Sequence, residues 1–259
     1  MATHYKDIQL TVVDRVARIT FAKPPLNVLT IATMKEITDA INKAGTIRDV
    51  CAIVFAAHPS TKAFSAGVSI EEHKAETIYQ MLEAFHGIFR TLHLLAKPVI
   101  AVVSGVALGG GCELVAYADI VIAARSARFG QPEIKVGVFP PVAAVLLPQV
   151  VGDRKAREMV LTGELLTAEM AHACGLVTYV VDDAELESKA AQLLGVLGKL
   201  SVPALEMSRR AINDTRGLRF EDALKRSEDI YLNQLMSHKD PHEGIDAFIA
   251  KRAPKWKHK

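Results

Sequence analysis

Short apolar runs alternate with segments of helical periodicity over the first two thirds of the chain. Residues 8–12 and 16–21 are rich in β-branched residues and are separated by Asp14 and Arg15, which predicts a hairpin. Residues 50–56 are apolar throughout, as expected of a strand that is buried on both faces. Further strands are expected at residues 98–103, 119–123 and 177–181.

Helical spacing of apolar residues separates these strands. Met34, Ile37 and Ile41 share one face, and Thr33 with Glu36 resembles a capping box. Further helices are expected at residues 77–95 and 111–117. Strands that are joined by helices imply crossover connections and a largely parallel sheet, and the handedness of such crossovers favours a coiled stack.

From Asp183 onward the pattern is helical alone. Helices are expected over residues 184–197, 204–215, 220–236 and 242–251, with breaks at Pro203 and Pro241. The sequence therefore predicts an α/β core over residues 1–195, followed by a C-terminal helical region over residues 196–259.

Composition and charge narrow the class of protein. The chain has 259 residues, of which 50% are hydrophobic and 23% charged, which suits a globular protein with a substantial core. A formal net charge of +2 is too small to indicate binding to nucleic acid or to an anionic membrane. The three cysteines, widely spaced among apolar residues, are expected to be free thiols in a reducing compartment. With no membrane-span pattern and no signal-peptide core in residues 1–10, a cytoplasmic protein is expected.

The C-terminal tail is strongly basic. Lys251, Arg252, Lys255, Lys257 and Lys259 occur there without any acidic residue. One interpretation is a solvated, frayed terminus. The other is a docking site for a ligand that carries phosphate.

Three consecutive glycines, Gly109 to Gly111, lie between an apolar strand and an apolar helix. Such a turn leaves free N–H groups at the positive end of a helix dipole, where an oxygen that becomes anionic during a reaction would be stabilised. A tight structural turn is the alternative. The spacing matches neither a dinucleotide fingerprint nor a phosphate loop.

Two carboxylates stand out near such turns. Glu113 lies in the first turn of an otherwise apolar helix, and Glu133 follows Pro132, where a short helix can open. Either carboxylate could be a helix cap. The helix, strand and turn between them can also bring both to one edge of a sheet, where two facing carboxyl groups can divide the roles of acid and base.

Three ordered motifs resemble those of the crotonase (enoyl-CoA hydratase/isomerase) superfamily, and the resemblance covers nearly the whole chain. They are Ala63-Phe64-Ser65-Ala66-Gly67, Ala107-Leu108-Gly109-Gly110-Gly111-Cys112-Glu113 and Phe129-Gly130-Gln131-Pro132-Glu133. The resemblance implies a spiral core of ββα units, and C-terminal helices that build a homotrimer or a dimer of trimers. It also implies an acyl-CoA thioester substrate, with no cofactor beyond the coenzyme A of the substrate.

Residue roles follow from the same resemblance. Glu113 is expected mainly to activate water and Glu133 mainly to deliver a proton to carbon. The amides of Ala66 and Gly110 are expected to form an oxyanion hole. Contacts to coenzyme A or the acyl group are expected from Ala63, Gly67, Ile70, Gly109, Phe139, Pro141, Phe248 and Lys251. No metal site is expected, because the nine histidines form no ligand pattern.

Departures from the family pattern bear on the substrate. Ser69 replaces the usual Asp, and Pro141, Val142 and Ala143 fill a stretch that is usually rich in glycine, which should reshape the acyl pocket. Three segments resemble the cyclohexa-1,5-diene-1-carbonyl-CoA hydratases: Val68-Ser69-Ile70-Glu71-Glu72-His73, Phe85-His86 with Phe89-Arg90, and Val138-Phe139-Pro140-Pro141. Hydration of a conjugated enoyl-CoA or a cyclic dienoyl-CoA is therefore expected. Isomerisation or another acyl-CoA reaction of the fold is the nearest alternative, and an RNA-binding member of the family is an alternative of a different class.

Overall fold

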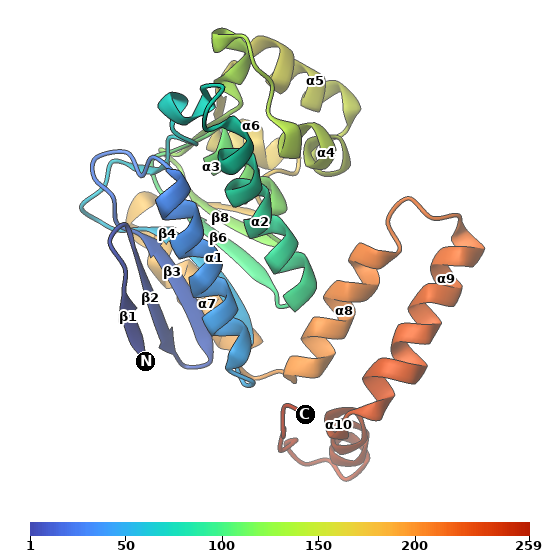
Figure 1. Cartoon of the computed structure of the whole chain (residues 1–259). Helices are drawn as coiled ribbons and strands as arrows, with labels where there is room; N and C mark the ends of the chain where they lie inside the picture. Colours follow the sequence, from blue (N-terminus) through green and yellow to red (C-terminus); the bar gives the residue numbers. More distant parts are fainter.

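A seven-stranded sheet forms the centre of the computed structural model, which describes residues 1–259 (Figure 1). The first three strands are antiparallel, so the expected hairpin is confirmed, and the remaining strands are parallel. In spatial order the strands are β1 (Ala2–His4), β2 (Ile8–Val13), β3 (Val16–Phe21), β4 (Ala52–Ala57), β6 (Val99–Val103), β8 (Ile120–Ala124) and β11 (Tyr179–Val181).

A second sheet of four short strands was not predicted. Its strands have only two or three residues, which is too short for a periodic pattern. In spatial order they are β10 (Leu166–Thr167), β9 (Arg128–Gly130), β7 (Val106–Leu108) and β5 (Ala63–Ser65). Strands β5, β7 and β9 are mutually parallel, so their carboxyl ends lie at one edge of the sheet. The α/β crotonase-like core that the sequence predicted is thus built from two sheets rather than one.

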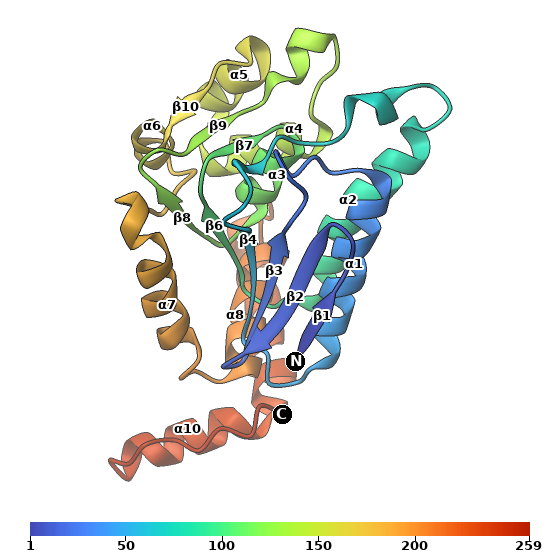
Figure 2. The same ribbon diagram turned by 90° about the vertical axis from the view of Figure 1, so that its left-hand side faces the viewer.

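Helices α1 (Ile31–Thr46) and α2 (Ile78–Leu95) pack against each other on one face of the large sheet, and α7 (Leu186–Leu197) covers the opposite face (Figure 2). The expected capping box of α1 is wrong. The helix begins earlier, and Thr30 is the cap, with its hydroxyl accepting from the Thr33 N–H. The Glu36 carboxylate instead accepts from the N–H groups of Lys6 and Asp7, which ties α1 to the start of β2.

Several short helices from two parts of the chain, residues 70–73 and 110–173, surround the ends of the small sheet. The helix α3 (Gly110–Tyr117) was expected. The others are the short 3₁₀ helices η1 (Ile70–His73) and η2 (Pro132–Val136), and the helices α4 (Pro141–Val150), α5 (Asp153–Thr162) and α6 (Ala168–Ala173). Apart from the short helix at Glu133, none of these was expected.

The C-terminal helices follow the core, and the last two of them stand away from its sheets (Figure 1). They are α8 (Val202–Asp214), α9 (Phe220–Asp229), a π-helical turn (Ile230–Gln234), a 3₁₀ turn (Leu235–Ser237) and α10 (Lys239–Ile249). Pro203 and Pro241 each lie in the first turn of a helix, where a proline costs no hydrogen bond. Two ion pairs, each with a buried cation and a partly exposed carboxylate, attach α8 to the core: Lys97–Glu206 at 2.8 Å and Arg209–Asp119 at 2.6 Å. The expected division after residue 195 falls in the last turn of α7 and stays a prediction.

The backbone of the basic tail is hydrogen-bonded to the rest of the chain rather than frayed, whereas its five basic side chains are exposed to solvent, as the first interpretation expected. The buried carboxylate of Asp240 accepts hydrogen bonds from the backbone N–H groups of Lys257 and His258. The indole N–H of Trp256 donates to Lys199 O at 2.8 Å. All three cysteines are free thiols, as expected. None of the helices combines the length and the hydropathy that a bilayer span requires.

Candidate active site

A cavity of about 410 Å³ opens at the carboxyl edge of the small sheet. The loops that follow β5, β7 and β9 form one side of it, and α2 with the start of α4 forms the other. Glu113 and Glu133 both line this cavity. The expected convergence of the two carboxylates, 20 positions apart in the chain, is therefore confirmed, while their catalytic roles stay a prediction.

Glu113 is almost completely buried, with 3% of its surface exposed. It lies in the first turn of α3, and its Oε1 accepts a hydrogen bond of 2.7 Å from the Ala143 N–H in the first turn of α4. Burial raises the pKa of Glu113 to about 8, against the lowering effect of the Ala143 hydrogen bond, and the nearby Glu133 raises it further. The positive end of α4 thus partly compensates the buried charge.

Glu133 lies in the first turn of η2, directly after Pro132. Burial raises the pKa of Glu133 to about 7. The side chain of Gln131 is fully buried beside it. With its amide nitrogen turned toward the carboxylate, Gln131 donates to Oε1 and Oε2 of Glu133 at 3.3 and 3.2 Å. Both carboxyl groups therefore titrate near neutrality in one shared, poorly solvated space.

Two backbone N–H groups beside the carboxylates have no acceptor within the chain. They belong to Gly110, the first residue of α3, and to Val68. The expected role of Ala66 is wrong, because its N–H donates to Leu26 O at 2.9 Å and cannot also bind a ligand oxygen. The Leu29 N–H donates to Gly67 O, and Leu29 O accepts from the Ser69 N–H. Because both hydrogen bonds of this bridge come from the residues on either side of Val68, the Val68 N–H points away from Leu29.

The two loops that carry these N–H groups are in direct contact. A Cβ added to Gly67 would lie 2.8 Å from Leu108 O and 3.3 Å from the Gly110 nitrogen. A Cβ added to Gly110 would lie 2.9 Å from a side-chain carbon of Val68 and 2.9 Å from the ring of Phe85. Glycine at these positions is what permits two amide donors to approach one ligand atom.

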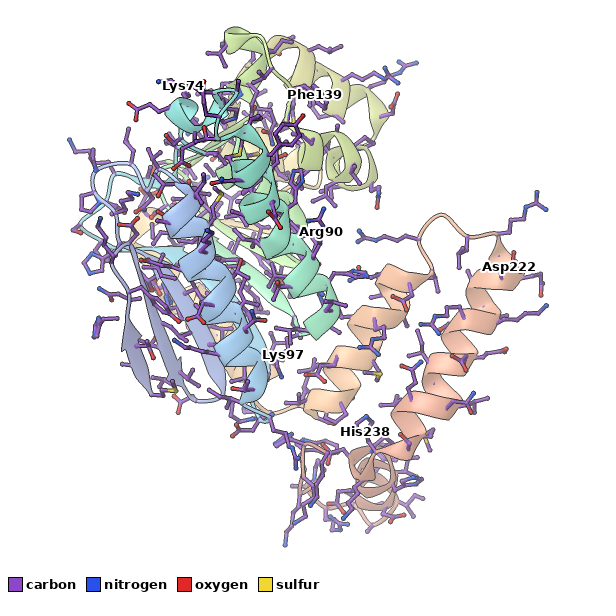
Figure 3. All side chains as sticks on the ribbon, viewed as in Figure 1. Lys74, Arg90, Lys97, Phe139, Asp222 and His238 are labelled. Carbon is purple, nitrogen blue, oxygen red and sulfur yellow. The ribbon has the colours of Figure 1, made fainter.

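Of the other residues expected to bind the substrate, five line the cavity: Gly67, Ile70, Gly109, Phe139 and Pro141. Phe139 is 63% exposed and lies at the mouth of the cavity (Figure 3). Ala63 is a wrong prediction. It is buried in β5, its carbonyl accepts from Asn27 Nδ2 at 2.8 Å, and it lies outside the cavity.

Phe248 and Lys251 lie at the end of α10, far from the cavity of their own chain (Figure 1). The Phe248 side chain is 85% exposed. His73 lines the cavity, with its Nδ1 2.9 Å from Ser69 O, whereas His86 lies on α2 outside the cavity. No group of three or more His, Cys, Asp or Glu side chains is placed to hold a metal ion.

Sequence reasoning missed Val68, Gln131 and Ala143. No local signal marks the free N–H of Val68, because its freedom depends on a bridge to a residue about forty positions away. The Ala143 contact had a signal, since two prolines favour the first positions of a helix and thereby predict free amides just after them.

Comparisons with known proteins agree with this geometry. Residues 12–259 match the model of the enoyl-CoA hydratase/isomerase family. A probable enoyl-CoA hydratase of Rhizobium meliloti is 37% identical, over 98% of this chain and 99% of the relative. A cyclohexa-1,5-dienecarbonyl-CoA hydratase of Thauera aromatica is 32% identical, over 93% of each chain. The crystal structure of an enoyl-CoA hydratase from Bacillus anthracis superposes with a TM-score of 0.91 at 26% identity, covering 98% of this chain and all of that one.

The chain belongs to the enoyl-CoA hydratase/isomerase family and has the crotonase fold. The expectation of a hydratase enzyme is confirmed at this level.

The position of the Glu133 carboxyl can be tested at Gly109. A methyl group there would lie 2.6 Å from Glu133 Oε1, and the φ angle of +51° disfavours any side chain. We expect Gly109→Ala to lower kcat for hydration of 2-butenoyl-CoA by about 10²-fold, because the added methyl group displaces the Glu133 carboxyl within the cavity. Gly195→Ala in α7, which meets no atom within 4 Å, is the control and should keep the wild-type rate. A wild-type rate in Gly109→Ala would show that this contact does not position Glu133.

Proposed function

We propose that the protein adds water across the C2=C3 bond of a conjugated acyl-CoA thioester through an enolate-like state. Its strongest support is one arrangement, in which two carboxyl groups with near-neutral pKa values face two free backbone N–H groups across one apolar cavity. The carboxyl groups can supply base and acid, and the N–H groups can supply electrostatic stabilisation.

The N–H groups of Val68 and Gly110 are the proposed oxyanion hole. The thioester carbonyl oxygen would accept from both, at the N-terminus of α3, where the helix dipole favours negative charge. That oxygen gains charge as water attacks C3, so the donors bind the transition state more strongly than the substrate. Loss of one such donor typically costs about 10²–10³ in kcat.

The carboxyl pair exchanges the protons. Mutual repulsion of the two charges means that the pair holds about one proton near neutral pH, and the two pKa values belong to the pair. The pKa of Glu113, about 8, is above that of Glu133, about 7, but the proton of a coupled pair can lie on either member. The Ala143 hydrogen bond favours the ionised form of Glu113, so we assign to Glu113 the activation of water. Water oxygen bonds to C3 while Glu113 takes a proton, and Glu133 gives its proton to C2.

For the acyl group we propose a compact conjugated system, with a cyclic dienoyl thioester as the particular candidate. Pro140 and Pro141 line the cavity, and they have apolar side chains and no backbone N–H. The Thauera relative, named for a cyclic dienecarbonyl-CoA, is similar over nearly the whole chain. A short linear enoyl-CoA is the alternative substrate, and double-bond isomerisation is the alternative reaction.

The coenzyme A moiety would be bound with help from a second copy of the chain. Phe248 and Lys251 do not reach the cavity of their own chain, and the exposed apolar residues of α10 are unsuited to remain in water. We therefore propose a homotrimer, or a dimer of trimers, in which α10 of one copy approaches the cavity mouth of another. The proposed enzyme is cytoplasmic and needs no cofactor besides the coenzyme A of its substrate.

Product analysis tests the reaction and the acyl group together. The protein is incubated with 2-butenoyl-CoA and with cyclohexa-1,5-diene-1-carbonyl-CoA, and products are resolved by mass spectrometry. We expect a mass gain of one water from both, with the larger kcat/KM for the cyclic thioester. A shifted alkene without an added hydroxyl would favour the isomerase. A protein that is inactive but binds RNA in a salt-dependent way would favour the binding class.

The carboxyl pair is tested by Glu113→Gln and Glu133→Gln. An amide keeps the shape of the side chain but cannot exchange the proton, so each variant should lose at least about 10²-fold in kcat. Binding of a saturated acyl-CoA, measured by calorimetric titration, should change little. A variant with wild-type turnover would exclude that residue from the reaction.

The pH dependence follows from the pair. Activity needs one carboxyl ionised and the other protonated. Below a pH of about 7 the pair takes up a second proton, and above about 8 it loses its last proton, so kcat/KM should fall on both sides. Stopped assays from pH 5 to 10 give the profile. In each Glu→Gln variant the pH profile of the residual rate should fall on one side of the optimum only. An unchanged bell-shaped profile would assign the two falls in rate to other groups.

A further inference from the structure

A second cavity, of about 550 Å³, lies behind the catalytic one. The helices α2, α3 and α4 each line both, with their N-terminal parts at the catalytic cavity and their C-terminal parts at the second cavity. On α3, Glu113 lines the first cavity and Tyr117 the second. Four residues of helix correspond to a separation of about 6 Å, the thickness of a single layer of side chains.

Phe89 fills the position between the two cavities and lines neither. Its ring centroid lies 5.1 Å from that of Phe85, which lines the catalytic cavity, and 5.4 Å from that of Tyr117. Both contacts are edge-to-face, with interplanar angles of 85° and 67°. Phe89 is 8% exposed and Phe85 2%, and we call this row of three contacting rings the aromatic wall.

The two sides of the wall differ in polarity. On the catalytic side the deep end is formed by the buried Met81 and Phe85 with Pro140. The basic side chains that line this cavity are those of His73 and Lys135, and Lys135 is exposed at the surface.

On the far side the lining includes Arg209 and Arg216. Arg209 is paired with Asp119, whereas Arg216 has no acidic partner within 4 Å. The hydroxyl of Tyr117 is buried there without a hydrogen-bond partner. A ligand anion could be bound on the far side, but on the near side a deep carboxylate would be desolvated without a partner.

We infer that Phe89 determines acyl-group specificity by closing the deep end of the acyl site. This inference rests on the proposed hydratase function. With Phe89 in place, the enzyme takes short or monocyclic apolar acyl groups and rejects both long chains and acyl groups with a terminal carboxylate. Without the ring, the two cavities join, and a long acyl chain can place a terminal carboxylate near Arg216.

The test compares wild type, Phe89→Ala and the milder Phe89→Leu on 2-butenoyl-CoA, 2-dodecenoyl-CoA and 2-dodecenedioyl-CoA. For the wild type we expect kcat/KM to be at least about 10-fold lower on both long substrates than on the short one. Phe89→Ala should raise the long-to-short ratio by at least about 10-fold, with Phe89→Leu in between. Adding Arg216→Met to Phe89→Ala should remove the gain on the dicarboxylic substrate alone.

Ile88→Ala is the matched control, because Ile88 is fully buried on the same helix and lines neither cavity. Its long-to-short ratio should stay at the wild-type value, and circular dichroism with thermal melting verifies that each variant is folded. A wild type that hydrates both chain lengths equally, or a folded Phe89→Ala and Phe89→Leu pair with an unchanged ratio, would overturn the inference while leaving the hydratase intact. The ratio of the dissociation constants of butanoyl-CoA and dodecanoyl-CoA measures chain-length selectivity without turnover. The effect of Phe89 can therefore be measured even if no substrate is hydrated.

Discussion

The burial of two carboxyl groups in one apolar cavity is the constraint on which the site depends. A buried carboxylate is costly unless it is paired, hydrogen-bonded or protonated. Here the Glu113 carboxylate accepts a hydrogen bond from the Ala143 N–H at the start of α4, and the side-chain amide of Gln131 lies beside Glu133. Repulsion between the two groups keeps a shared proton near neutral pH. The same burial that is unfavourable for folding therefore supplies an acid and a base at one place.

The small sheet brings these groups together. Strands β5, β7 and β9 are adjacent and parallel, so the loops at their carboxyl ends meet at one edge. The first of these loops supplies the Val68 N–H, the second leads into Gly110 and Glu113, and the third carries Gln131 and Glu133. Ligand sites of α/β proteins commonly lie outside the carboxyl ends of parallel strands, and this sheet of very short strands serves that purpose.

Periodicity and motif order predicted much of the large framework and the identity of the carboxyl pair. The strand β4 and the helix α2 are long enough for their patterns to be clear, and the glycines before Glu113 mark a turn that a ligand can approach. The small sheet could not be predicted, because its strands are as short as two residues. Nor could spacing distinguish Val68 from Ala66 as the free amide, since the hydrogen bond to Leu26 decides it. The packed tail depends likewise on a contact between Asp240 and residues at the far end of the chain.

Along the helices α2, α3 and α4, the groups of the proposed reaction and the residues of the proposed acyl-group selectivity lie at different positions. The first turn of α3 holds the free Gly110 amide and the Glu113 carboxylate, and the first turn of α4 holds its partner amide, Ala143. Under the proposed function these positions tolerate little change, because each donor or acceptor faces the reacting atoms. One to two turns further along, Phe85, Phe89 and Tyr117 contact one another rather than the reacting atoms. A change of ring size there alters the length of the acyl site while the carboxyl pair keeps its hydrogen bonds. In this chain the proposed chemistry thus lies at the helix starts, and the proposed acyl-group selectivity lies further along the same helices.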